Sequence, residues 1–184
     1  MAPGMAFAHT GPGDVHDFVH GFMHPLGGFD HLVAMVAVGV LAAQLGGRAL
    51  WLIPAAFVAT MAVTGTLGAA GVEIPFVESG IALSVLVLGA AIAFEVALPI
   101  AGAAVLVAFF AIFHGYAHGA EIPASISGTP YGLGFVAATA LLHGCGIALG
   151  LLLGGAEGGL GRRLVRLAGG AAAITGVVLM ASAA

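Results

Sequence analysis

Histidines and carboxylates gathered in two short strings are the residues of this chain that could do chemistry. The first string, His24 to His31, reads HPLGGFDH, and the second, Phe113 to Glu121, reads FHGYAHGAE. Both lie at the edge of strongly apolar segments, where imidazole and carboxylate groups are unfavourable unless they hold something. Neutral imidazole and carboxylate oxygen are ligands for divalent transition metals, so the two strings predict a metal site.

The spacing of these residues predicts a row of metal ligands along a path rather than one isolated metal site. His114, His118 and Glu121 follow one another at i, i+4 and i+7, which puts them on one stripe of a helix over roughly 10 Å. His143 lies within a later apolar segment, roughly 18 Å below its outer edge, and is predicted to be a metal ligand deeper on the same path. The full set of predicted metal ligands is His24, Asp30, His31, His114, His118, Glu121 and His143.

Each group of candidate ligands also has a purely structural interpretation. Asp30 either ligates the metal or orients an imidazole, and as an alternative Asp30 and His31 cap a helix and pair with a neighbouring one. His114 and His118 are alternatively hydrogen-bonded packing residues at a crossing that two nearby glycines make close. His143 alternatively bonds a neighbouring backbone group.

Upstream of the first string, residues 14–24 are predicted to form a short amphipathic helix. His16, His20 and His24 repeat every four residues on one face of it, opposite two phenylalanines. Such a helix would lie in the membrane interface, and Pro25 is expected to end it. Its histidines either collect cations or simply face water. The predicted outer collecting site consists of His9, His16 and His20.

The composition of the whole chain places these strings in a membrane protein. Of its 184 residues, 61% are hydrophobic and only 7% are charged, and the four basic residues are all arginine. A water-soluble domain of this length could not cover its surface with so few polar groups. We therefore expect an all-α membrane protein, a bundle of six transmembrane helices with a short N-terminal interfacial helix. The predicted spans are 26–45, 49–70, 79–98, 100–119, 131–153 and 163–183.

The order of these segments divides the chain into three regions. Residues 1–8 end in a pattern of small residues typical of the site that signal peptidase cuts, so they are predicted to be a signal-peptide remnant, with a merely disordered end as the alternative. Residues 9–25 form an external histidine-rich interfacial segment, and residues 26–184 form the six-helix transmembrane domain. Arg48 and the arginines near position 163 fall in loops on the same side of the membrane. Arginine-rich loops are cytoplasmic, so both termini are expected outside.

Other residue types exclude other kinds of site. A net charge of −4 without basic clusters excludes nucleic acid, so the expected partners are a metal ion and the lipid bilayer, with a homo-oligomer as an open alternative. The single cysteine, Cys145, excludes an internal disulfide and a thiolate cluster, and it is expected to pack rather than to ligate. Met35, Met61 and Met180 are interpreted as packing residues, too dispersed for a soft-metal relay. No organic cofactor is expected.

The polar strings belong to longer segments with a recognisable pattern. Residues 24–35 read HPLGGFDHLVAM, residues 113–121 read FHGYAHGAE, and residues 139–147 read TALLHGCGI. These segments resemble the HupE/UreJ family of hydrogenase and urease accessory proteins, and the similarity covers nearly the whole chain from His9 onward. The first string is also similar to the H-x4-D-H signature of broader nickel and cobalt transporters, although the gap here is five residues.

The resemblance implies a permease of the bacterial inner membrane, with its N-terminus in the periplasm, that supplies nickel to hydrogenase or urease. Cobalt would also be admitted, and the chain is not expected to be an enzyme. The donor set itself suits Ni(II), Co(II), Zn(II) and Cu(II) alike. Two alternatives stay open, namely an intramembrane zinc-dependent hydrolase and a membrane protein that binds or senses metal without moving it. Because the ligands must be unprotonated, uptake is expected to weaken as the pH falls through the imidazole range at about 6.5.

Overall fold

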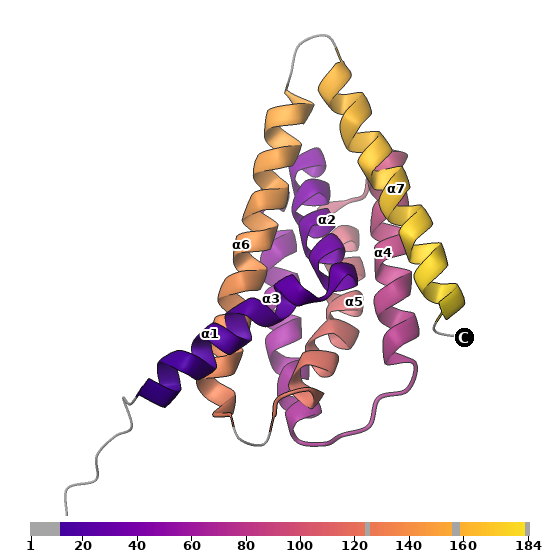
Figure 1. Cartoon of the computed structure of the whole chain (residues 1–184). Coiled ribbons are helices and arrows are strands. Elements are labelled where there is room, and N and C mark those ends of the chain that lie inside the picture. The colour runs from indigo at the N-terminus through magenta and orange to yellow at the C-terminus, as the bar shows by residue number, and fades with distance from the viewer. Residues whose placement is uncertain (1–11, 124–125, 156–158, 183–184) are drawn as a thin grey trace, which may run out of the picture.

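The computed structural model of the chain is all-helical over the residues that it describes, which are 12–123, 126–155 and 159–182. Figure 1 shows a bundle of helices that run up and down, with the first helix lying obliquely at its side. The predicted all-α class is confirmed. The helices are α1 Pro12–Gly27, α2 Phe29–Leu45, α3 Ala49–Ala69, α4 Val77–Ala93, α5 Ile100–Ala120, α6 Gly128–Gly154 and α7 Leu160–Ser182.

The length and apolar character of these helices are those of a multi-pass membrane protein. Within the described ranges, four helices can each cross a membrane alone, namely α3, α5, α6 and α7. Helices α1 and α2 qualify only as one bent pair, with an angle of 85° between them, which raises the number of spans to five. Helix α4 is apolar but has only 17 residues. The predicted number of six spans is therefore not confirmed, although α2 to α7 each overlap one of the predicted spans.

The junction between α1 and α2 differs from the prediction. Helix α1 continues through Pro25 to Gly27, so the prediction that Pro25 ends this helix is wrong. A proline removes the hydrogen bond to the residue four positions earlier and crowds the carbonyl of that residue, and so close to the end of a helix this affects a single turn. The chain turns instead at Gly28, where the backbone is extended with φ −93° and ψ 112°. The interfacial location of α1 stays a prediction.

Glycines bring pairs of helices into close contact. A Cβ atom added at Gly115 of α5 would collide with the backbone of Met61 on α3, and one added at Gly119 would collide with the backbone of Gly65. The close crossing expected around the second string is therefore present between α3 and α5. Glycines join α1 to α6, α2 to α6 and α4 to α7 in the same way.

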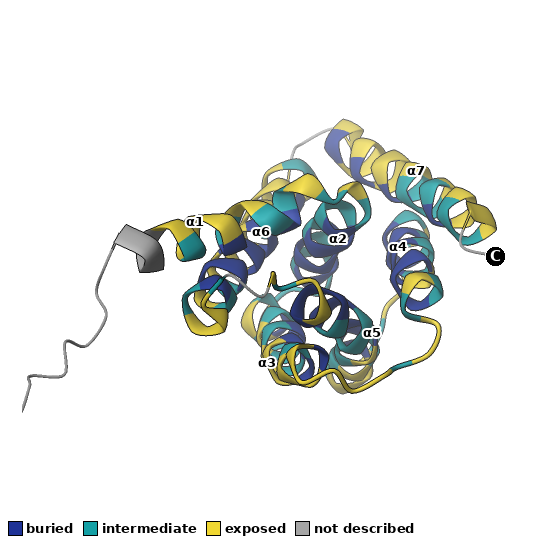
Figure 2. Cartoon of the chain, turned by 60° about the horizontal axis from the view of Figure 1, so that its bottom comes forward, coloured by how far each residue is buried: buried dark blue, intermediate teal, exposed yellow. Residues whose placement is uncertain are grey.

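From α2 onward, the connections between helices lie at two opposite ends of the bundle (Figure 1). The α2–α3 junction, which carries Arg48, and the α6–α7 connection, which precedes the three arginines of α7, lie at one end (Figure 1). The α3–α4 and α5–α6 connections lie at the other end, and Glu121 directly follows α5 there. Figure 2, a view with this second end turned forward, shows buried residues facing the middle of the bundle. The arginines thus share one end, as the sequence predicts.

Candidate metal centre

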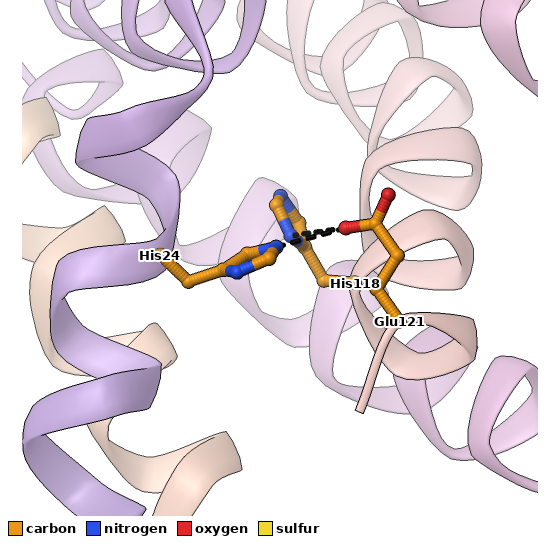
Figure 3. Close-up of side chains that lie close together, drawn as sticks. All are labelled: His24, His118 and Glu121. Atoms are coloured by element: carbon orange, nitrogen blue, oxygen red, sulfur yellow. Dashed lines mark hydrogen bonds and ion pairs between the residues drawn. The ribbon is translucent and has the colours of Figure 1, made fainter. Parts of the chain in front are cut away.

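The two polar strings meet near the end of the bundle opposite the arginines. Nε2 of His24, on α1, and Oε2 of Glu121 are hydrogen-bonded across 2.8 Å, and Nδ1 of His118 lies 3.9 Å from the same oxygen. Figure 3 shows the three side chains converging from α1 and from the end of α5. One ligand atom of each residue lies within 4.8 Å of the other two. The structure therefore brings residues of both strings together, while metal binding itself stays a prediction.

Further imidazoles continue from His118 into the bundle. The ring centroid of His31, on α2, lies 4.2 Å from that of His118 and 4.8 Å from that of His114. All three residues are buried, and His114 is completely so. The carboxylate of Asp30 accepts hydrogen bonds from Nδ1 and from the backbone N–H of His31, each at 2.8 Å. In this arrangement Asp30 orients an imidazole, which is one of the two roles that the sequence allows.

Hydrogen bonds fix the tautomers of two of these imidazoles. Because Nδ1 of His31 donates to a carboxylate, the lone pair of the neutral ring is on Nε2. Ser84 of α4 donates its hydrogen to the carbonyl of Ile81 at 2.6 Å, so its oxygen must accept from Nε2 of His114 at 2.9 Å. The lone pair of His114 is therefore on Nδ1.

The nitrogens left over by these bonds are buried without partners. Nε2 of His31, Nδ1 of His114 and both nitrogens of His118 have no hydrogen-bond partner among the described residues. Buried polar atoms of this kind are rare in proteins and call for an explanation. Metal-binding imidazoles typically have their other nitrogen held by a carboxylate, carbonyl or hydroxyl group. His31 and His114 match this arrangement and are free on the remaining nitrogen.

His143 lies on α6, in the interior of the bundle. Its Nδ1 donates to the backbone carbonyl of Met35 across 2.8 Å, so its lone pair is on Nε2, for which the described part of the chain offers no hydrogen-bond partner. The ring of Phe57 contacts both His143 and His114, at centroid distances of 5.1 and 5.6 Å. His143 therefore bonds a backbone group, as the structural alternative proposes, and still has one nitrogen available for a ligand.

The predicted outer collecting site is placed only in part. His16 and His20 are exposed on α1, with ring centroids 6.4 Å apart, and His9 lies outside the described residues. His24, on the same helix, lies against His118 instead, at a centroid distance of 4.9 Å. The structure thus brings His24, but neither His16 nor His20, to the buried imidazoles. The collecting role of the outer histidines stays a prediction.

Three residues around the histidines are not identified by sequence reasoning. Phe135 packs against His118 at a centroid distance of 4.0 Å, and Tyr131 precedes it by one turn of α6. Both lie on the helical stripe that leads to His143, and this spacing is the signal that could have found them. Ser84 has no such signal, because a lone serine in an apolar helix forms no pattern.

Two cavities lie near opposite ends of the helices. One of about 500 Å³ lies between α3, α5 and the first half of α6, and its lining includes His118, Tyr131 and Met61. The other, of about 830 Å³, lies at the arginine end, where Glu95 and Arg162 are among its lining residues. The two cavities share no lining residue. Of the buried imidazoles, that of His118 lines the first cavity, which extends to Ile122 and Gly128 beside the α5–α6 connection.

Comparisons with known proteins point to one family. A model of the family described as HupE / UreJ protein matches residues 1–179. Protein HupE of Rhizobium leguminosarum bv. viciae is 46% identical over 178 residues, which are 97% of this chain and 91% of that protein. This chain belongs to the HupE/UreJ family. No solved structure matches it.

Membership of the HupE/UreJ family confirms the resemblance that the sequence shows. The match covers all three resembling segments, so the described cluster of imidazoles and carboxylates lies within the part shared with the family. The family relationship places the chain among the hydrogenase and urease accessory proteins of membranes.

Proposed function

We propose that this HupE/UreJ protein is a permease of the bacterial inner membrane for a divalent transition metal, with nickel as the main cargo and cobalt also admitted. The metal is passed on to supply hydrogenase or urease, and the chain itself catalyses no reaction. The observation that carries the proposal is a row of buried imidazole nitrogens that have no hydrogen-bond partner among the described residues. This row begins beside the carboxylate of Glu121, at the end of the bundle opposite the arginines. A purely structural role would leave these nitrogens unexplained.

The proposed path begins where His24, His118 and Glu121 converge. The carboxylate supplies negative charge there, and two imidazoles replace part of the hydration shell of the incoming ion. The cavity of about 500 Å³ beside His118 gives the ion room to approach.

The second part of the path runs through the free nitrogens of His31 and His114 and then to His143. Asp30 offsets part of the positive charge of a metal ion bound at His31, because its carboxylate is bonded to that ring. An inside-negative membrane potential would draw the ion inward, with roughly 2.3 kcal/mol per elementary charge for each 100 mV.

Uptake of radiolabelled nickel tests the proposal. We compare cells that express the parent chain, His31→Ala or Cys145→Ala, and we measure the amount of each chain in the membrane. His31→Ala should reduce uptake to the background of cells without the chain, because it removes one free ligand and leaves the Asp30 carboxylate without the ring that it orients. Cys145→Ala should transport like the parent, since Cys145 is exposed. Unchanged uptake by His31→Ala at equal abundance would defeat the proposed path.

Purified chain in sealed lipid vesicles separates transport from the other two functions. A permease carries nickel into the vesicle lumen. Binding without accumulation inside would instead indicate a metal-binding or sensor protein. Turnover of a lipid or peptide that depends on zinc, without any ion flux, would indicate the hydrolase.

A further inference from the structure

Two methionine sulfur atoms lie together beyond His31. The hydroxyl oxygen of Thr139, on α6, lies 3.5 Å from the sulfur of Met35 on α2 and 3.7 Å from the sulfur of Met61 on α3. All three residues are buried. Met35 follows His31 by four residues on α2, about 6 Å further along the helix. The interpretation of these methionines as too dispersed to act together is therefore wrong for this pair, because the fold brings both sulfurs to one hydroxyl.

The direction of the Thr139 hydroxyl differs from that of other hydroxyls in these helices. Thr64, Ser84 and Thr175 each donate to a carbonyl of their own helix, as hydroxyls in apolar helices commonly do. Thr139 is directed at the two sulfurs instead. It has a single hydrogen, so it can donate to only one of the two sulfurs at a time.

His143 supplies a third donor one helical turn from Thr139. It follows Thr139 by four residues on α6, so the two side chains share one stripe of the helix. The bond from its Nδ1 to the carbonyl of Met35 ties the ring to one of the sulfur-bearing residues and leaves Nε2 free and buried. Two thioethers at Thr139, and one imidazole a single turn of α6 further along, thus come from three neighbouring helices. None of the hydrogen bonds found among the described residues joins a carboxylate to this group.

We propose that Met35, Met61 and His143 form a second cation site, which prefers soft monovalent ions of the Ag(I) and Cu(I) class. Thioether sulfur selects soft cations, and uncharged donors in an apolar interior favour a low charge on the ion. A divalent cargo binds weakly here and moves on, as conduction requires, whereas a soft monovalent ion is retained and blocks the path. The blocking effect rests on the proposed function, but the binding of the ion does not.

Silver titration of the full-length chain in lipid nanodiscs tests the site directly. The protein carries Cys145→Ala, because the exposed thiol would itself bind silver, and its methionine methyl groups are labelled with carbon-13. Silver nitrate should shift the methyl resonances of Met35 and Met61 together and leave that of Met180, on α7, in place. Met35→Leu and Met61→Leu assign these resonances, and each should weaken silver binding at this site at least about tenfold.

Matched variants keep the outcome interpretable. Leucine and methionine have similar volumes, so the substitutions should preserve the fold, and Met180→Leu should bind silver like its parent. Silver should also inhibit nickel uptake by the parent and inhibit the double variant of Met35→Leu and Met61→Leu much less. Unmoved resonances of Met35 and Met61 at saturating silver, or equal shifts of the Met35, Met61 and Met180 resonances, would overturn the site.

The silver titration and the nickel experiment fail independently. If silver shifts both methyl resonances but His31→Ala leaves nickel uptake intact, the soft site stands and the proposed function falls. If nickel uptake depends on His31 while both resonances stay in place, the proposed function stands and the soft site falls.

Discussion

The hydroxyl of Ser84 accepts a hydrogen bond from Nε2 of His114 across 2.9 Å, while its own hydrogen goes to the carbonyl of Ile81. This pair leaves the lone pair of the neutral His114 ring on Nδ1, which has no hydrogen-bond partner among the described residues. Ser84→Ala should therefore weaken nickel binding about 10- to 100-fold, the usual effect of removing a group that orients a metal-binding imidazole. Equilibrium dialysis with purified protein measures the change. Ser79→Ala on the same helix is the control, and equal affinities for all three proteins would show that Ser84 does not orient a ligand.

Nickel uptake should fall as the medium becomes more acidic. The proposed ligands include several imidazoles, which must be unprotonated to bind a metal, so protons compete with nickel on the acid side. Uptake should decrease between about pH 7.5 and about pH 5.5, a window that spans the ordinary imidazole range. Initial rates in vesicles whose membrane potential is clamped at every pH measure the effect. A constant rate across this window would count against coordination by histidine.

Close packing of α5 on α3 should make Gly119 intolerant of a side chain. An added Cβ atom would collide with the backbone of Gly65, which cannot move aside as a flexible side chain could. We expect Gly119→Ala to destabilise the protein by about 1–3 kcal/mol, the range typical of overpacking. Thermal unfolding in detergent measures this. Gly102→Ala, on the same helix but with only Pro99 within 4 Å of the added atom, should unfold like the parent.

The sequence predicts the convergence of distant strings better than it predicts individual contacts. His24 and Glu121 are far apart in the chain, but the positions of the arginines and the alternation of helices put the ends of both strings on one side. Topology alone therefore indicates that they can meet. Ser84 and Thr139 escape prediction, because a hydroxyl in an apolar helix becomes informative only when the rotation of that helix is known.

The spacing of glycines indicates in part how a helix is rotated about its axis. The two glycines of the second string mark the face of α5 that packs on α3, and Gly115 lies against the backbone of Met61 there. Composition cannot show which partner such a face meets, so the pairing of Met61 with Met35 is visible only in the fold. Pro25 leads to a wrong prediction of where α1 ends. Proline is a strong local signal for the end of a helix, but it has little effect here because the helix ends two residues later.

An ion pair at the arginine end should hold α7 to the connection between α4 and α5. Both side-chain nitrogens Nε and Nη2 of Arg162 donate to the carboxylate of Glu95, at 2.5 and 2.6 Å. The Arg162 guanidinium lowers the pKa of Glu95 below its ordinary value of 4.5. Since the folded-state pKa is the lower one, the stabilisation is present above pH 4.5 and is lost as the pH falls through the folded-state pKa.

Glu95→Gln should therefore lower the Tm slightly at neutral pH and leave it unchanged in acid. High salt should reduce the difference, because both groups are partly exposed. Arg162→Gln should have the same effect, and combining the two changes should add little. Arg163→Gln is the control. A Tm difference between the parent and Glu95→Gln that persists in acid would mean that the carboxylate stabilises the fold in another way.

The arginine end of the bundle should face the cytoplasm, as the positive-inside rule requires. Leu160 begins α7 at this end, and Glu73 lies in the α3–α4 connection at the opposite end; both are exposed. We would introduce Leu160→Cys and Glu73→Cys one at a time into the Cys145→Ala protein. A maleimide that cannot cross the inner membrane should label Glu73→Cys in intact spheroplasts and should label Leu160→Cys only after the membrane is opened. The reverse pattern would turn the proposed path around, with Glu121 at the cytoplasmic mouth.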